Sequence, residues 1–600
     1  MEIGPKYKTN GDCEFVVWAP FRKLSLQLLT PKEQIFQMEK DEKGFWRATI
    51  ENIQHEVCYR YILDSSLIRP DPASHFQPYG IYNASQTVNH VLFNWNDSDW
   101  KGIDLSSMII YELHVGTFTA EGNFEAIIPR LEELRSIGIN SIELMPIAQF
   151  PGERNWGYDG VFPFAVQNSY GGPIGLKKLV NECHKKGLAV ILDVVYNHLG
   201  PVGNYLSDFG PYFTDKYKTP WGNAINYDGQ YSDLVRNYFI ENALHWFRNY
   251  HIDSLRLDAV HTIYDKSAKP FLKELAMCVR DYSKEQGRDF YLIAENDLRN
   301  SGMIQPAALT DYGINAQWCD DLHHCLHAIL TGEHIGFYAD FDSEQKLVQC
   351  MKNGYISLNR KTQLESENFN DMQFVVYCQN HDQIGNRIYG ERLSSLISFE
   401  ALKLAAGIVI LSPFIPLLFM GEEFAADSPF LYFANYSNHY LTEAVKKGRL
   451  EEFKKIGLIG TQSDPFEIET FISSKLKWES RTSGNHKIML KFYKHLLQLR
   501  TLLPVLSNLD RSCMDVDIID NTNVIVMRRW ADEHSVLIML NFNKMDITFK
   551  LYAPPGRWWK ILDSADILFG GPGTLMHSSF VTGDFITLRC NSVSVLNKVE

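Results

Sequence analysis

Between about residues 108 and 420, short apolar runs alternate with helical stretches, and no other feature of the sequence constrains the fold as strongly. Eight strand candidates occur in this span, each followed by helical or loop sequence. They are residues 109–113, 139–144, 188–195, 254–258, 290–295, 314–318, 374–378 and 415–420. Near-continuous apolar runs are typical of parallel strands that helices cover. Eight successive βα units predict a closed (β/α)8 barrel of the TIM type rather than an open sheet.

Sequence rich in β-formers flanks this barrel on both sides. Four short runs, broken by Pro, Gly and charged turns, lie at 15–20, 24–28, 46–50 and 59–63. Their spacing predicts a small β-sandwich of immunoglobulin-like type over residues 1–100. The barrel domain is expected over 101–505, with an amphipathic helix at 488–503 and an elaborated loop at about 199–232. β character returns after residue 516, so residues 506–600 are predicted to form a C-terminal β domain. The fold class is therefore α/β.

Charge and cysteine content exclude several classes of function. The 58 Lys and Arg against 72 Asp and Glu give a formal net charge of −14. No basic surplus is available for phosphates, so nucleic acids and anionic membrane surfaces are poor partners. The N-terminus lacks the apolar core of a secretory signal, and the longest nearly apolar run, 405–420, predicts a buried helix end and a buried strand rather than a bilayer span. The ten cysteines are dispersed without a CxxC pair, which favours a reducing compartment, the cytoplasm.

Polar residues follow four of the strand candidates, at the barrel edge where enzymes of this fold keep their active sites. They are Asp193, Asn197 and His198 after the third strand, Arg256 and Asp258 at the fourth, Glu295 after the fifth, and Asn380, His381, Asp382 and Gln383 after the seventh. Converging carboxylates suit acid–base chemistry on a neutral substrate. Glycoside hydrolysis, for example, needs one carboxylate at the anomeric carbon and one protonated acid at the leaving oxygen.

Two other interpretations are compatible with these residue types. In a divalent-metal hydrolase, His198, His381 and the carboxylates would be ligands, but no HExxH or comparable closely spaced set is present. We therefore expect no metal and no cofactor. A catalytically inactive barrel that binds glycans is the second alternative, and the joint presence of three carboxylates after buried strands argues against it.

Four segments resemble the four motif regions of the α-amylase superfamily of glycoside hydrolases, in order and at the expected strands. They are residues 193–198, 256–258, 295 and 380–382. The resemblance implies that Asp258 is the nucleophile, that Glu295 is the general acid/base, and that Asp382 stabilises the oxocarbenium-like transition state. It further implies supporting roles in sugar binding and orientation, for Tyr158, Asp193, His198, Arg256 and His381. Asn296 follows Glu295 where Ser is more typical, which leaves the fine positioning of Glu295 open.

Within the superfamily, longer segments resemble the malto-oligosyltrehalose trehalohydrolases. They are residues 69–78, 211–214, 219–222, 258–261, 379–386, 421–424 and 429–433. This resemblance implies malto-oligosyltrehalose as the substrate and hydrolysis of the α-1,4 bond next to its terminal trehalose. A glucan branching or debranching enzyme is the alternative, since it would share the flanking β domain, the barrel and the carboxylates.

A further group of residues is expected to bind this substrate. The segment after the sixth strand resembles a substrate-binding segment of the family. The group comprises His261, Asp320, Asp321, His323, His324, Gln383 and Asn386, with Trp221 as a stacking wall. A helix cap is the alternative role for the segment at 320–324, and hydrogen bonding within a loop is the alternative for Gln383 and Asn386.

Overall fold

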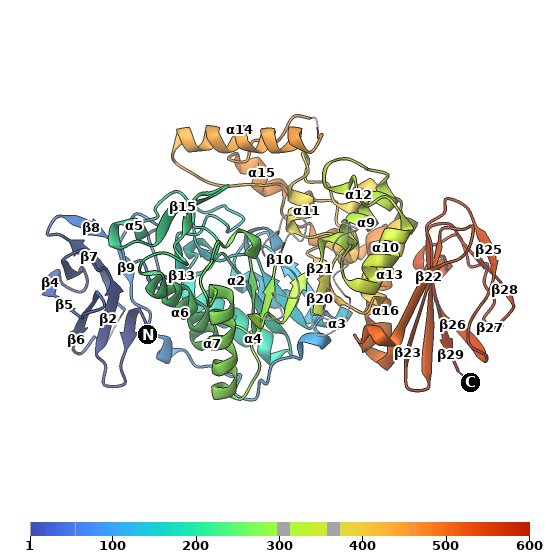
Figure 1. Cartoon of the computed structure of the whole chain (residues 1–600), viewed down its shortest axis with the longest axis horizontal. Coiled ribbons are helices and arrows are strands. Elements are labelled where there is room, and N and C mark those ends of the chain that lie inside the picture. Colours follow the sequence, from blue (N-terminus) through green and yellow to red (C-terminus); the bar gives the residue numbers. More distant parts are fainter. Residues whose placement is uncertain (1, 54–55, 297–311, 357–372, 459, 600) are drawn as a thin grey trace.

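The computed structural model describes residues 2–53, 56–296, 312–356, 373–458 and 460–599 (Figure 1). Its centre is a closed barrel of eight parallel strands in sequence order. They are β10 (Ile110–Leu113), β11 (Ser141–Leu144), β14 (Ala189–Val194), β17 (Ser254–Leu257), β18 (Tyr291–Ala294), β19 (Ala316–Trp318), β20 (Gln373–Val376) and β21 (Ile415–Phe419). β21 pairs with β10 and closes the barrel. All eight lie within or overlap the predicted apolar runs, so the TIM-type barrel is confirmed.

Helices cover the barrel because each has an apolar face at helical spacing. The main ones are α3 (Leu131–Ile137), α4 (Gly172–Lys185), α6 (Ser232–Tyr250), α7 (Phe271–Gln286), α9 (Asp320–Thr331), α13 (Phe399–Leu411) and α16 (Gly484–Leu502). On α4, for example, the buried Leu176, Leu179, Val180 and Cys183 share one face. The apolar run at 405–420 is the end of α13 followed by β21, as predicted. Among the described residues, none of the helices combines the length and apolar character that a bilayer span requires.

The loop after the third barrel strand has secondary structure of its own. It contains α5 (Leu206–Phe209) and a hairpin of β15 (Phe213–Thr219) and β16 (Gly222–Ile225). Helices α14 (His439–Lys455) and α15 (Ile468–Ser473) follow the last barrel strand, β21, in the chain. β15 and α14 both lie on the upper side of the barrel in Figure 1.

The N-terminal part is a β-sandwich, as predicted. One sheet has the order β1 (Gly4–Tyr7), β2 (Cys13–Trp18), β6 (Phe45–Ile50) and β5 (Glu39–Lys40). The other has the order β4 (Gln34–Gln37), β3 (Leu24–Leu28), β7 (Cys58–Leu63) and β8 (Leu67–Arg69), with β9 (Ser85–Gln86) paired to β7. Phe15 on the first sheet and Tyr59 on the second meet edge to face, with ring centroids 4.8 Å apart.

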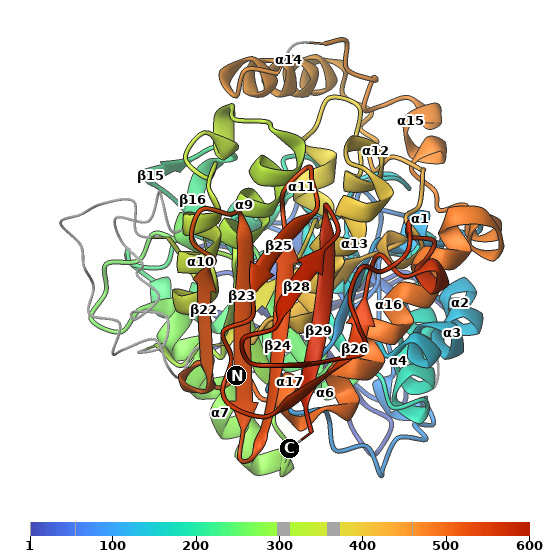
Figure 2. The same ribbon diagram turned by 90° about the vertical axis from the view of Figure 1, so that its right-hand side faces the viewer.

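The C-terminal part is a second antiparallel β structure, which packs on α13 and α16 (Figure 2). Its larger sheet has the order β22 (Met514–Ile518), β23 (Val524–Ala531), β24 (His534–Asn541), β29 (Ser592–Lys598), β26 (Arg557–Asp563) and β27 (Ser579–Val581); β25 (Ile547–Lys550) pairs with β28 (Phe585–Leu588).

Buried cations bridge this β structure and the barrel. The ammonium of Lys403, on α13, donates to the carbonyls of Ser564 at 2.5 Å and Phe569 at 3.0 Å. In the other direction, Arg529 on β23 donates to the carbonyl of Leu411 at 2.9 Å. Both side chains are buried, so each cation is satisfied by backbone of the neighbouring part.

All ten cysteines lie within the described residues, and none of them forms a disulfide. The closest sulfur pair that a hydrogen-bond contact records is Cys319 and Cys350, at 3.8 Å, far from the length of a disulfide bond.

Candidate active site

Arg256 joins the carboxylates at the ends of three neighbouring strands, β14, β17 and β18. It lies on β17 and is fully buried. Its Nη1 donates to Asp193 Oδ2 at 2.8 Å and to Asp258 Oδ1 at 3.0 Å, and its Nη2 lies 2.7 Å from Glu295 Oε2. The guanidinium also covers the ring of Trp318, 4.3 Å from its centroid. One arginine therefore orients the predicted nucleophile and the predicted acid/base together.

Backbone geometry after β17 fixes the position of Glu295. Ala259, which follows Asp258, has a φ of 39°, in the left-handed region that non-glycine residues rarely adopt. This turn directs the Ala259 N–H to Glu295 Oε2, at 2.9 Å. Strain of this kind persists where surrounding contacts hold it, and here it places a donor on a predicted catalytic carboxylate.

The three predicted catalytic carboxylates have different pKa values because their surroundings differ. Burial and the charges of Asp258 and Asp382 together raise the pKa of Glu295 to about 7, against the opposing effect of Arg256. Burial likewise raises the pKa of Asp258 to about 6, again against Arg256. Although burial opposes it, His381 lowers the pKa of Asp382 to about 2. Glu295 thus holds a proton most tightly, which is the division that an acid beside a carboxylate nucleophile requires.

Hydrogen bonds show how Tyr158 and His381 are linked to this cluster. The Tyr158 hydroxyl donates to Asp193 Oδ2 at 2.7 Å and lies 2.7 Å from His381 Nε2. His381 Nε2 also lies 3.4 Å from Asp382 Oδ2. On the other side of the ring, Nδ1 bonds Glu112, which also accepts the His381 backbone N–H at 3.1 Å. Despite burial, Asp382 and Glu112 raise the pKa of His381 well above its usual range, so the ring is a cation.

Glu112 carries no sequence signal of a role in the site, because it lies inside β10 rather than after a strand. Its partner in the strand register is Glu143 on β11, which is also buried. The two carboxylates differ in their surroundings. Within the described residues, neither Glu143 oxygen has a hydrogen-bond partner. Burial, with the charges of Glu112 and Asp193, raises the pKa of Glu143 well above its usual range, so Glu143 is a neutral acid.

This contrast gives a testable prediction. Glu112→Gln removes the anion that neutralises the buried His381 cation, so we expect the free energy of unfolding to fall by about 3–5 kcal/mol at pH 7. Glu143→Gln is the matched control, because it replaces a neutral buried acid by a neutral amide and should cost less than about 1.5 kcal/mol. Denaturant unfolding of both variants measures the difference. Equal losses would contradict the charge assignment of the two residues.

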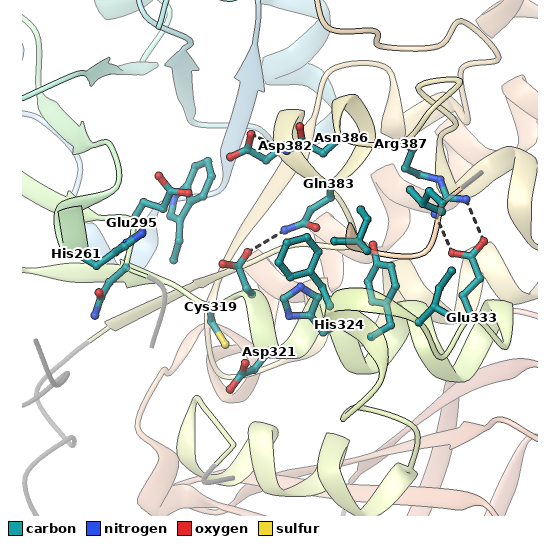
Figure 3. Close-up of a pocket in the computed structure, with 18 residues that line it drawn as sticks. His261, Glu295, Cys319, Asp321, His324, Glu333, Asp382, Gln383, Asn386 and Arg387 are labelled. Atoms are coloured by element: carbon teal, nitrogen blue, oxygen red, sulfur yellow. Dashed lines mark hydrogen bonds and ion pairs between the residues drawn. The ribbon is translucent and has the colours of Figure 1, made fainter. Parts of the chain in front are cut away.

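A cavity of about 430 Å³ extends from these carboxylates (Figure 3). At one end lie Glu295 and His261, and at the other end Arg387 pairs with Glu333. The remaining lining residues are Asn296, Trp318, Cys319, Asp320, Asp321, His324, Ile335, Phe337, Tyr338, Asp382, Gln383, Asn386, Ile456 and Leu458. Eight residues of the predicted site therefore line one continuous space.

Gln383 and Asn386 belong to hydrogen-bond networks at this cavity. Gln383 Nε2 donates to Asp320 Oδ1 at 2.9 Å. Asn386 Nδ2 donates to Asp382 Oδ1 at 3.3 Å, and its carbonyl oxygen accepts from Arg449 of α14 at 2.6 Å. Arg449 thereby connects helix α14 to Asn386, which itself bonds Asp382, the predicted transition-state stabiliser.

The four candidates on α9 do not all face the cavity, because a helix spreads consecutive residues around its axis. Asp320, Asp321 and His324 line it. Asp321 Oδ2 also accepts the Ile356 N–H at 2.7 Å. His323 is not among the lining residues, and its Nδ1 lies 2.6 Å from the Cys378 carbonyl.

His198 lies beside the cavity, with both ring nitrogens near protein partners. They are the Asn197 side-chain oxygen at 3.1 Å and the Tyr158 carbonyl at 3.0 Å. Its ring stacks on Trp221, with centroids 4.2 Å apart. Trp221, between β15 and β16, is half exposed, so one indole surface is open to a ligand. The elaborated third loop thus places an aromatic ring on His198, but neither residue is among those that line the cavity.

The end of the cavity opposite Glu295, its far wall, is formed by residues that belong to none of the sequence motifs. Arg387 and Glu333 form two parallel contacts, at 2.8 and 3.0 Å, and His327 Nε2 lies 2.7 Å from the same carboxylate. Tyr338 stacks on His327, with centroids 4.0 Å apart. Glu333 and Arg387 are 54 residues apart in the chain, so no local pattern could have predicted their pairing.

Known proteins resemble this chain over most of its length. Residues 93–220 match the family model of the α-amylase catalytic domain. The malto-oligosyltrehalose trehalohydrolase of Saccharolobus solfataricus is 46% identical over 508 residues, which cover 83% of this chain and 87% of the relative. The enzyme of the same name from Rhizobium sp. (strain M-11) is 39% identical and covers 89% of this chain and 91% of its own.

Solved structures agree with these sequence matches. A putative α-amylase from Salmonella typhimurium, 33% identical, superposes with a TM-score of 0.85 over 100% of both chains. A pullulanase from Anoxybacillus sp. LM18-11 in complex with maltotetraose has a TM-score of 0.74 at 18% identity, over 100% of this chain and 87% of its own, which shows the fold alone. Identities of 46% and 39% over more than four fifths of the chain show the family. The chain is a glycoside hydrolase that belongs to the malto-oligosyltrehalose trehalohydrolase family, within the α-amylase superfamily.

Proposed function

We propose that this enzyme hydrolyses the α-1,4 bond that joins a malto-oligosaccharide to its terminal trehalose, with retention of configuration. The observation that supports this most is the set of carboxylates around Arg256, in which Glu295 has the highest pKa of the three predicted catalytic groups. A protonated acid beside an ionised carboxylate is the pair that a retaining glycosidase uses.

Each group has a defined task in this proposal. Asp258 attacks the anomeric carbon of the malto-oligosyl unit, while Glu295 gives its proton to the bridging oxygen and trehalose leaves. Glu295 then removes a proton from water, which hydrolyses the glycosyl–enzyme bond. Asp382, whose low pKa keeps it ionised, stabilises the positive charge that develops on the sugar ring.

Selectivity for trehalose would come from the Glu295 side of the cavity, because the proton must reach the oxygen of the leaving group. His261 lies beside Glu295 there. Trp221, which stacks on His198 and is half exposed, would offer a stacking surface. Asp320, His324 and Gln383 lie away from Glu295 and would contact the sugars that stay on the enzyme. A polar group that the wrong disaccharide leaves buried and unpaired costs about 1–3 kcal/mol, so two such groups suffice for a preference of about 100-fold.

Two substrates of equal length test this proposal. Maltotriosyltrehalose and maltopentaose each contain five glucose units and differ in the terminal linkage. We expect release of trehalose from the first to exceed release of any sugar from the second by about 100-fold in kcat/KM, as measured by chromatography of the products. Similar rates on both would move the assignment to an amylase, and new α-1,6 branches on amylose without free trehalose would move it to a branching enzyme.

A further inference from the structure

Three histidines from distant parts of the chain meet between the N-terminal sandwich and the barrel. His75 follows β8, His90 lies in the short 3-10 helix His90–Leu92, and His245 lies on α6. One ring nitrogen of each residue lies within 4.8 Å of one nitrogen of both others. His75 and His245 are 5% and 4% exposed, and all three rings line a cavity of about 560 Å³ that is separate from the active site.

The spacing of the ring nitrogens suits a shared cation. His75 Nδ1 and His90 Nε2 are 3.2 Å apart. Two nitrogens bound tetrahedrally to zinc at about 2.0–2.1 Å lie about 3.3 Å from each other. The third nitrogen lies within 4.8 Å of both others, and binding of a shared cation would have to draw it closer.

The hydrogen bonds of His245 already orient it as a ligand would be. Its Nε2 donates to the Phe164 carbonyl at 3.2 Å, so the lone pair is on Nδ1. The side-chain amide of Asn249 donates to this Nδ1 at 2.9 Å. Histidines that bind metals commonly donate their other N–H to a backbone carbonyl in this way. A cation would take the place of the Asn249 donor.

Charged groups also surround the three histidines. Lys177 is a nearby cation that donates to the His90 carbonyl at 3.1 Å. The cavity is also lined by three carboxylates, Glu2, Glu14 and Glu241, and by three cations, Lys6, Arg47 and Arg248, so its charged side chains balance and Lys177 remains a cost that the histidine ligands must offset.

Ordinary packing explains this cluster poorly. His90 Nδ1 is buried and has no hydrogen-bond partner within the described residues. Buried polar groups in proteins are normally satisfied, and this nitrogen is an exception. His75 Nδ1 and His90 Nε2 bond each other, and both nitrogens of His245 have partners. We propose that His75, His90 and His245 bind one transition-metal cation of the zinc class, with water in the cavity as the fourth ligand. The ion joins the segment after the sandwich to α6 of the barrel and stabilises their contact.

Metal analysis of the full-length protein tests this proposal. After treatment with a chelator, wild type dialysed against micromolar Zn²⁺ should retain one equivalent per chain, and Zn²⁺ should raise its Tm. His90→Gln and His245→Gln should each bind at least about 100-fold more weakly and lose the Tm response. His577→Gln, an exposed histidine of the C-terminal β structure, is the matched control and should behave as wild type.

Three results would overturn the proposal. They are a folded wild type that takes up no zinc, zinc retained equally by both site variants, and zinc bound by groups other than imidazole. X-ray absorption of zinc-loaded wild type gives the ligand set without any variant, so it decides the matter even where a histidine variant fails to fold. Three imidazole ligands are expected.

Discussion

Asp258→Asn should lower kcat for maltotriosyltrehalose by about 10⁴-fold or more, because the amide cannot form the glycosyl–enzyme bond. The side chain is nearly isosteric and keeps an oxygen for Arg256, so the fold and the neighbouring carboxylates should be retained. Single-turnover kinetics, together with a thermal unfolding curve for the variant, measures the effect.

The matched control for this loss is Asp321→Asn. Asp321 lines the same cavity and accepts the Ile356 N–H, so its amide should cost about 100-fold at most in kcat/KM. The anomer formed first by wild type, followed by NMR, tests the same assignment independently. An initial α product is expected from a retaining enzyme, and an initial β product would exclude Asp258 as the nucleophile.

Glu295→Gln should lower kcat for the natural substrate by about 10²–10⁴-fold, because the leaving oxygen is no longer protonated. A malto-oligosyl fluoride needs no proton to release its leaving group, so formation of the glycosyl–enzyme from it should be nearly unaffected. The comparison of the two substrates by single-turnover kinetics identifies the acid. A variant that is equally slow on both substrates would point to a different role for Glu295.

The same residue should set the alkaline limb of the pH profile. Glu295 acts in its protonated form, and its raised pKa of about 7 means that kcat/KM should fall as the pH rises above that value. Asp258 acts ionised, so its pKa of about 6 gives the acidic limb. In Glu295→Gln the alkaline limb should disappear, while in Glu333→Gln, which changes another carboxylate of the same cavity, it should remain. Persistence of the limb in Glu295→Gln would contradict the assignment.

The barrel could be predicted because parallel strands covered by helices are apolar along their whole length, which gives eight recognisable runs. The predicted catalytic carboxylates directly follow such strands or lie a few residues beyond them, so their position in the chain already indicates the rim. Glu112 and Glu143 could not be interpreted in this way. Both lie inside strands, and only the fold decides which residue each of them contacts. Glu112 bonds His381, whereas Glu143 has no hydrogen-bonding partner within the described residues.

The sequence also did not show which side chains of a helix would face the cavity. Asp320, Asp321, His323 and His324 are nearly consecutive, but helical geometry turns His323 towards the Cys378 carbonyl rather than into the cavity. The far wall depends on Arg387 and Glu333, whose contact joins two loops that only the fold brings together. The domain boundaries near residues 100 and 505 and the roles of the substrate-binding residues stay predictions.

Hydrogen bonds of buried cations across the contact between the barrel and the C-terminal sheet affect how the chain unfolds. Lys403 finds its acceptors on Ser564 and Phe569, and Arg529 finds one on Leu411. Separating the two parts would break these bonds and leave each cation only the acceptors of its own part. These are Glu400 for Lys403 and the carbonyls of Leu506 and Asn508 for Arg529. We therefore expect the predicted domain boundary near residue 505 not to separate two unfolding units, so that heat or denaturant melts both parts in a single transition.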